Sequence, residues 1–93
     1  MIKSFRDKQT KALFDGFLPR RFPADVRPAA QRKLRLVHEA RTLNDLRNPP
    51  GNRLEALQGD RAGQHSIRIN DQWRVCFTWA IDGADAVEVA DYH

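Results

Sequence analysis

The chain has 93 residues and a mass of 10.7 kDa, the size of one small domain. Apolar residues make up 41% and charged residues 30%, and the net charge is +4. No apolar run approaches the roughly 20 residues of a membrane helix, residues 1–7 lack the apolar stretch of a secretory signal, and the single cysteine excludes an internal disulfide. We expect one cytoplasmic domain spanning residues 1–93, with no membrane partner, no structural metal and no cofactor.

The positive charge is concentrated in the first half of the sequence. Residues 1–42 contain 11 basic and 4 acidic residues, whereas residues 43–93 contain 5 basic and 8 acidic residues. A basic half on so small a protein indicates an anionic partner, with nucleic acid as the first candidate. The alternative is a solvated, arginine-rich surface.

The N-terminal residues predict a short strand followed by a helix. Apolar and polar residues alternate from Ile2 to Phe5, which is typical of a strand. Asp7 is a suitable N-cap for a helix that continues to Phe14. Gly16 fits the left-handed position that ends such a helix.

A second helix is predicted to begin near Asp25, with Pro28 tolerated in its first turn. Four apolar residues recur at helical spacing and form one face: Val26, Ala30, Leu34 and Val37. Basic residues fall mostly outside that face: Arg27, Arg32, Lys33 and Arg35. The helix is therefore amphipathic, with a basic outer side.

Residues 48–52, Asn-Pro-Pro-Gly-Asn, divide this helical half from a strand-rich half. Alternating patterns and turn residues predict strands over residues 53–58, 64–70, 73–81 and 86–92. The Asp82-Gly83 pair marks a hairpin turn. The sequence therefore predicts an α+β fold, in which two N-terminal helices cover one face of a four- to five-stranded, mostly antiparallel sheet.

The clearest strand carries two aromatic residues, Trp73 and Trp79, on one side and Cys76 on the other. At this spacing we interpret the tryptophans as core residues, although they could stack on bases. We interpret Cys76 as a buried thiol and not as a nucleophile. The three histidines are far apart and match no metal-binding spacing, and there is no glycine-rich phosphate loop.

Polar residues on the side of the sheet away from the helices are the first candidates for a site. Arg61, Arg68 and Arg74 lie in the strand region. Arg68 and Arg74 fall at the alternate positions of their strands that carry polar residues. Neighbouring guanidinium groups can hold one phosphate. The alternative is that each arginine forms a surface ion pair with an acidic residue such as Glu55, Glu88 or Asp91, a kind of pair that contributes little.

The final residues, Asp91, Tyr92 and His93, place three proton-transferring side chains at a strand end. Glu55 is a further candidate base. The alternatives are a frayed terminus and an exposed solubilising charge.

Several motifs together resemble the HigB-type toxins of the RelE/ParE superfamily, which belong to bacterial toxin–antitoxin modules. They are Met1–Phe5, Leu57–Gly63, Ser66–Ile69 with Gln72–Val75, and Asp91–His93. The resemblance covers nearly the whole chain. It implies a RelE/ParE-like microbial ribonuclease fold and a ribosome-dependent endoribonuclease that cleaves mRNA in the ribosomal A site. It also implies neutralisation by a helix-turn-helix antitoxin of the HigA type, in a complex that binds operator DNA.

Residue by residue, the resemblance assigns Asp91, Tyr92 and His93 to the catalytic C-terminus of that family. Arg74 matches an arginine at the scissile phosphate, and Arg61 matches a basic position near the cleft. Some members have a histidine where this sequence has Glu55.

RNA cleavage without a metal needs a base, a cation at phosphorus and an acid for the leaving group. Glu55 or Asp91 can be the base, Arg68 and Arg74 can hold the phosphate, and His93 can be the acid. The basic helix residues named above and the pair Arg20-Arg21 are then expected to contact ribosomal RNA.

Two other classes of function remain open. ParE-type toxins use the same fold to inhibit DNA gyrase but lack the ribonuclease residues. A non-catalytic RNA-binding module is the second alternative.

Overall fold

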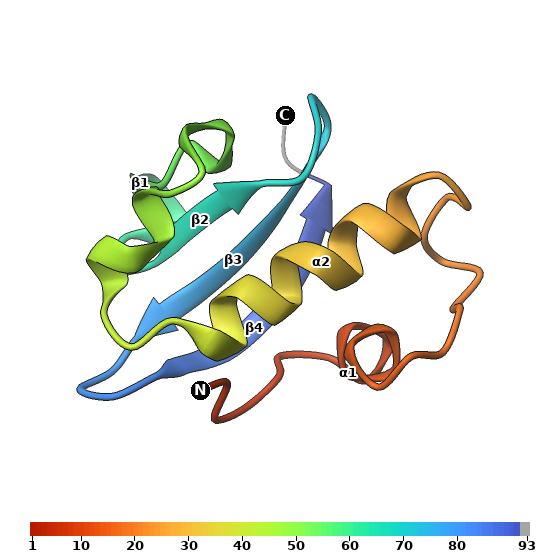
Figure 1. Ribbon diagram of the computed structural model, residues 1–93, viewed down its shortest axis with the longest axis horizontal. Helices are drawn as coiled ribbons and strands as arrows, with labels where there is room; N and C mark the ends of the chain where they lie inside the picture. Colours follow the sequence, from red (N-terminus) through yellow and green to blue (C-terminus); the bar gives the residue numbers. More distant parts are fainter. Residues whose placement is uncertain (92–93) are drawn as a thin grey trace.

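The computed structural model describes residues 1–91, and two helices in it cover one face of a four-stranded antiparallel sheet (Figure 1). The strands follow one another in the order β1-β2-β3-β4, each paired with its neighbour in sequence. The elements are α1 (Lys8–Phe14), α2 (Val26–Glu39), β1 (Glu55–Ala56), β2 (His65–Arg68), β3 (Trp73–Trp79) and β4 (Ala84–Asp91). The predicted fold class is therefore confirmed. No helix within these residues is long and apolar enough to cross a membrane.

Helix α1 begins and ends where the sequence predicts. Asp7 Oδ1 accepts a hydrogen bond from the Thr10 backbone N–H at 2.7 Å, which satisfies one of the unpaired amides of the first turn. Gly16 has φ +98°, a left-handed conformation that side chains disfavour.

Helix α2 is held by its apolar face and not by its cap, because Asp25 makes no side-chain capping bond. The four residues predicted for that face are all buried against the sheet. On the sheet side they meet Ile67, Val75 and Phe77, and Trp73 packs edge-on against Phe22 with the ring centroids 5.6 Å apart. Trp79 is half-buried against the same core. Both tryptophans are thus core residues, as predicted.

Shortening a side chain in this core is expected to destabilise the fold strongly. Leu34 is fully buried between α2 and the sheet. Leu34→Ala removes its contacts and leaves a cavity, so we expect a loss of about 2–5 kcal/mol in the free energy of unfolding. A urea titration of both proteins measures this loss, with Leu18→Ala as the control because Leu18 is exposed. Equal midpoints for the Leu34→Ala protein and the wild type would contradict it.

The prediction of a strand over Ile2–Phe5 is wrong in detail. This segment forms two isolated parallel bridges, Ile2 with Ala84 and Phe5 with Val87, along the outer edge of β4. The ladder between them is interrupted because Ala86 adopts a left-handed φ of +51° and its N–H is bound by the Ser4 hydroxyl at 2.8 Å. The segment covers the edge of the sheet without becoming a regular strand.

The strands also differ in length from the prediction. The expected strand over residues 53–58 shrinks to β1, because a 3₁₀ turn at Pro50–Asn52 precedes it and Arg53 has a left-handed φ of +46°. Strand β2 stops at Arg68, where Asn70 Oδ1 accepts from the backbone N–H of Gln72 and Trp73 and forms the turn. Strand β3 ends at Trp79 and β4 begins earlier than predicted, at Ala84. Tyr92 and His93 lie outside the described residues.

Candidate functional site

The face of the sheet opposite the helices, called the open face here, carries most of the polar residues singled out from the sequence. Register pairs place one row across all four strands, because Glu55 pairs with Ser66, Ser66 with Cys76, and Cys76 with Glu88. Arg74 lies beside this row on β3, with Arg68 and Ala90 as its register partners. The sheet thus brings together side chains from residues 55 to 90.

Arg74 is held on the open face by two hydrogen bonds. Its Nε donates to the Ser66 hydroxyl at 2.7 Å, and its Nη2 donates to the Arg53 backbone carbonyl at 2.8 Å. The carboxylate of Glu55 lies 3.6 Å from the same Nη2. The Arg74 side chain is only 12% exposed, whereas that of Glu55 is 51% exposed. A fixed cation therefore lies beside an accessible carboxylate.

Arg61 forms a second charged group on the same face. Its Nη1 donates to Glu88 Oε1 at 3.0 Å and to Gln64 Oε1 at 3.1 Å. The Glu88 side chain is 15% exposed, so this ion pair is more shielded than an ordinary surface pair. The ion-pair alternative raised from the sequence is correct for Arg61, and the pair also fixes the guanidinium in place.

Cys76 lies under these charges and is almost fully buried, packed with Leu57 and Ala90. Burial raises the pKa of its thiol, and the positive charges of Arg61, Arg74 and Arg6 oppose that shift only in part. A thiol held protonated is a poor nucleophile. Its interpretation as a buried thiol is confirmed.

Arg68 and Asp91 lie at the end of the sheet, away from the row. Arg68 is paired with Asp71 at the tip of the β2–β3 turn. Asp91 is the register partner of Trp73 and so alternates with the open-face positions, and its Oδ2 accepts from Gln72 Nε2 at 3.0 Å. The described contacts of both side chains are therefore with the β2–β3 turn.

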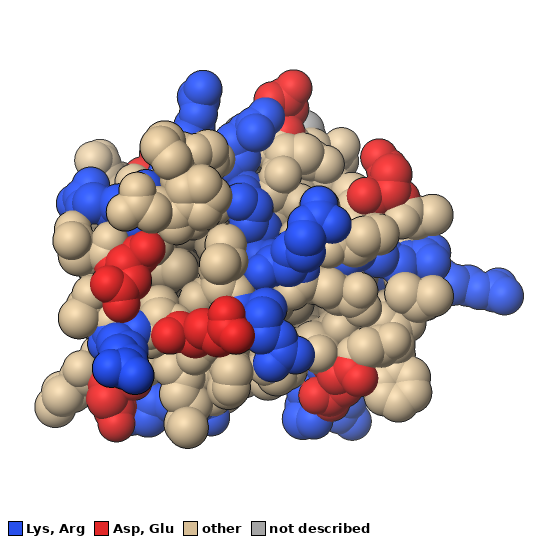
Figure 2. Space-filling view, viewed as in Figure 1, with Lys and Arg blue, Asp and Glu red and all other residues tan. Residues whose placement is uncertain are grey.

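The basic residues of α2 lie on the opposite side of the molecule from the open face. Figure 2, viewed from the helix side, shows basic side chains gathered over α2. A groove of about 880 Å³ crosses this surface, where Arg32, Lys33 and Arg35 accompany the apolar residues Phe14 and Leu36. Arg32 and Arg35 thus lie on the helix side, whereas Lys33 reaches Asn52, next to the Arg53 whose carbonyl binds Arg74.

These basic groups differ in how far neighbouring groups already bind them. Arg27 Nε donates to the Phe22 carbonyl at 3.0 Å, and Lys33 Nζ binds the side-chain oxygen of the buried Asn52. Burial, followed by the charges of Arg32 and Arg68, lowers the pKa of Lys33. Arg32 is exposed, and Lys33 is half-buried. Lys33 and Arg27 therefore contribute to local structure as well as to charge.

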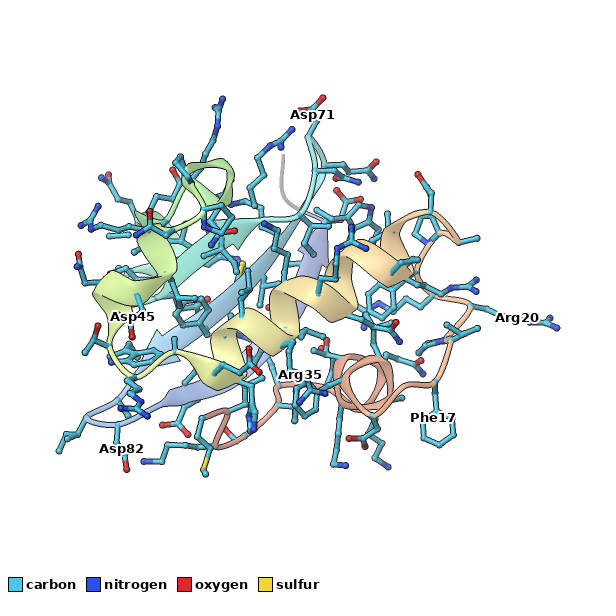
Figure 3. The ribbon with its side chains drawn as sticks, in the orientation of Figure 1. Phe17, Arg20, Arg35, Asp45, Asp71 and Asp82 are labelled. Atoms are coloured by element: carbon cyan, nitrogen blue, oxygen red, sulfur yellow. The ribbon has the colours of Figure 1, made fainter. Side chains whose placement is uncertain are left out.

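Arg35 and the Arg20-Arg21 pair are surface groups on the helix side. The Arg35 guanidinium lies 4.7 Å from the centroid of the Phe14 ring, between the two helices (Figure 3). Arg20 projects away from the loop that joins α1 to α2 (Figure 3). Arg21 Nη1 lies 3.6 Å from Asp7 Oδ1.

Within residues 1–91, no group of three His, Cys, Asp or Glu side chains could hold a metal ion. The His38 Nδ1 accepts from the Ile2 N–H at 3.1 Å, and the His65 ring stacks on Phe77 on the helix side of the sheet. These two histidines serve the packing. Tyr92 and His93, assigned to catalysis from the resemblance, lie outside the described residues.

Sequence reasoning assigned no role to two residues of the open face and its edge. Ser66 is fully buried although strand alternation places it on the polar side of β2, and Arg6 brings a positive charge close enough to act on Cys76. Strand alternation already placed the Ser66 side chain on the same face of the sheet as Arg68, so its face could be predicted. Its pairing with Arg74 could not, because strand register is a tertiary property.

Comparison with known proteins identifies the family. Residues 3–93 match the family described as the RelE-like toxin of type II toxin–antitoxin system HigB. The chain is 38% identical to Toxin HigB-1 of Vibrio cholerae, covering 100% of this chain and 98% of that protein. It is 32% identical to Endoribonuclease HigB of Proteus vulgaris, over the full length of both.

The fold is also that of a solved structure. A mutant of YafQ from E. coli superposes with a TM-score of 0.67 at 13% identity, covering 98% of this chain and 91% of that chain. With a family match over almost every residue, the resemblance drawn from the sequence motifs is confirmed. The chain belongs to the HigB-like toxins, the RelE-like toxins of type II toxin–antitoxin systems, and so has an antitoxin as its partner.

Proposed function

We propose that this toxin is a metal-independent endoribonuclease that cleaves mRNA in the ribosomal A site and so inhibits translation. The observation that carries the proposal is the pairing of Arg74, fixed and nearly buried, with the accessible carboxylate of Glu55 on the open face. A fixed cation stabilises charge that develops on a phosphate, and a neighbouring carboxylate can accept a proton. The name of the Proteus vulgaris relative supports the same activity.

The chemistry is a transfer of the phosphodiester from one ribose oxygen to another. The carboxylate of Glu55 or Asp91 takes the proton of the 2′-hydroxyl, and the 2′-oxygen forms a bond to phosphorus. The Arg74 guanidinium stabilises the negative charge on the phosphoryl oxygens. The P–O5′ bond breaks, and the imidazolium of His93 gives its proton to the departing 5′-oxygen. The resemblance assigns Tyr92 to the same catalytic C-terminus.

The phosphate is held by the remaining arginines of the sheet. Arg61 is oriented by Glu88 and lies close enough to Arg74 that the charges of both act on Cys76. Arg68 is the register partner of Arg74 at the end of β2. Displacing Asp71, whose side chain is almost fully exposed, would free Arg68 for RNA at little cost.

The helix side has a different role in this proposal, which is to contact ribosomal RNA. Four exposed bases belong to α2 and the loop before it: Arg20, Arg21, Arg32 and Arg35. Figure 2 shows basic side chains gathered over α2. Arg27 and Lys33 add charge while bound to neighbouring groups. Contacts with RNA phosphates through such residues weaken as salt increases. Cleavage and docking would then use opposite faces.

The remaining parts of the proposal follow from the family. The partner is a helix-turn-helix antitoxin of the HigA type, and the complex binds operator DNA. Because ribosomes, mRNA and the operon are its targets, the toxin acts in the cytoplasm.

A reconstituted translation system tests the activity. We expect the purified toxin to cut mRNA on translating ribosomes and to leave naked RNA intact. The products should carry a 5′-hydroxyl and a 2′,3′-cyclic or 3′-phosphate, because the 2′-oxygen is the attacking group. Cleavage should also persist with EDTA when polyamines and cobalt hexammine keep the ribosomes intact.

Each alternative gives a different result in that assay. Efficient cutting of naked RNA would contradict ribosome dependence, and 5′-phosphate ends would contradict attack by the 2′-hydroxyl. Intact mRNA with inhibited gyrase would favour a ParE-like toxin. Binding to RNA without any cleavage would favour the non-catalytic module.

A further inference from the structure

Ser66 occupies an unusual position for a residue on the open face. Its relative exposure is 0%, although it lies on the side of the sheet that the helices leave uncovered. The hydrogen bond from Arg74 Nε, at 2.7 Å, is the contact that its hydroxyl makes among the described residues. A buried hydroxyl acceptor of this kind holds a guanidinium in one orientation, because the Nε–H direction fixes the plane of the whole group.

A second anchor holds the same guanidinium from the other end. The Arg53 carbonyl accepts from Arg74 Nη2 at 2.8 Å. Arg53 itself is held in a left-handed conformation, with its N–H bound to the Pro50 carbonyl at 3.1 Å. The preceding residue, Asn52, is fully buried and donates to two backbone carbonyls of the same loop. The Arg53 carbonyl therefore belongs to a loop that internal hydrogen bonds hold in place.

These two anchors leave one part of the guanidinium unused. Within residues 1–91, no side chain or carbonyl accepts a hydrogen bond from Arg74 Nη1. Nη1 carries two N–H groups, and both can donate to phosphate oxygens. In this geometry Nη1 can donate to a phosphate, whereas Nε is already bound to the Ser66 hydroxyl.

We propose that Ser66 is a positioning residue of this toxin, which with the Arg53 carbonyl orients Arg74 so that its Nη1 binds the scissile phosphate. The inference rests on the proposed ribonuclease function. Ser66 acts through Arg74 and does not touch the RNA. Arg74→Lys keeps the positive charge but loses the hydrogen bonds to Ser66 and to the Arg53 carbonyl. The charge alone is therefore not expected to restore cleavage.

The test compares single-turnover cleavage of ribosome-bound mRNA by the wild type, Ser66→Ala and Ser66→Cys. Ser66→Cys keeps the approximate volume and provides only a weak acceptor. Both variants lose or weaken a hydrogen bond to a charged group, so we expect their cleavage rates to fall by about 10-fold or more. Binding to ribosomes should remain unchanged. Thr78→Ala is the matched control, because Thr78 is exposed on the same side of β3, and it should cleave as the wild type does.

A double-mutant cycle separates positioning from a general structural effect. In the Arg74→Ala background, Ser66→Ala should cause no further loss, because the group that it orients is absent. A further loss of the same size in that background would overturn the proposal. Wild-type rates for both Ser66 variants would overturn it as well.

Nuclear magnetic resonance supplies a readout that does not depend on activity. The Arg74 Nε–H should exchange slowly with solvent in the wild type and at least 10-fold faster in Ser66→Ala. Unchanged exchange would overturn the proposal. If the wild type and Thr78→Ala both fail to cleave mRNA on ribosomes, the proposed function fails and the positioning role fails with it. If they cleave and the Ser66 variants do too, only the positioning role fails.

Discussion

His93→Gln is expected to abolish growth inhibition and to slow ribosome-dependent cleavage by about 10²–10⁴-fold, the usual contribution of a general acid. The resemblance to the HigB-type toxins assigns this residue to catalysis, and His is the side chain that titrates nearest to neutral pH. Glutamine keeps a hydrogen-bonding group of similar reach but cannot give up a proton to the 5′-oxygen. The loss should therefore be in the rate of the chemical step and not in binding to the ribosome.

The control for this variant is its thermal unfolding. The buried apolar residues that form the described core lie between Leu13 and Ala90 and are unchanged by the substitution. We expect a Tm close to that of the wild type. His65→Gln is a matched variant, because His65 faces the helix side of the sheet, and it should retain cleavage once its own Tm is taken into account. Full toxicity of His93→Gln would transfer the role of the acid to Asp91 or Tyr92.

Arg74→Ala is expected to lower the cleavage rate by about 10²–10³-fold, the scale seen when one group that stabilises transition-state charge is removed. Arg74→Lys should recover little of this loss, since lysine offers a point charge without the planar fork. Single-turnover cleavage on ribosomes measures both variants. Arg47→Ala is the matched control, because it removes one positive charge from an exposed side chain outside the site.

Folding should survive the loss of Arg74, although at some cost. The Ser66 hydroxyl is buried and would lose its hydrogen-bond donor, which costs about 1–3 kcal/mol. A modestly lower Tm with a folded spectrum is therefore the expected result. An unfolded protein would show that Arg74 is principally structural, and cleavage at the wild-type rate would exclude it from the phosphate site.

Local patterns were enough to predict most of the secondary structure. The Asp7 cap and Gly16 defined α1, and the spacing of Val26, Ala30, Leu34 and Val37 defined the buried face of α2. Each of these signals is carried by residues of a single helix, which are close in sequence. The strands were less accurately bounded, because the extent of a strand depends on its pairing and packing with segments distant in sequence. The two-residue β1 shows this, since its length depends on β2 and on the turn that precedes it.

The sequence by itself also determined the family and the side of the sheet on which Arg74 and Cys76 lie, since strand alternation has a fixed period of two. Only the tertiary structure decided which groups meet. Arg74 reaches the Arg53 carbonyl 21 residues away, and Arg61 reaches Glu88 27 residues away. It also decided that α2 covers the face opposite these arginines while Lys33 reaches Asn52 beside Arg53, because a helical pattern fixes a residue's side of its own helix and not the face of the sheet that the helix covers. Strand order and register set these pairings, and neither is encoded in the spacing of neighbouring residues.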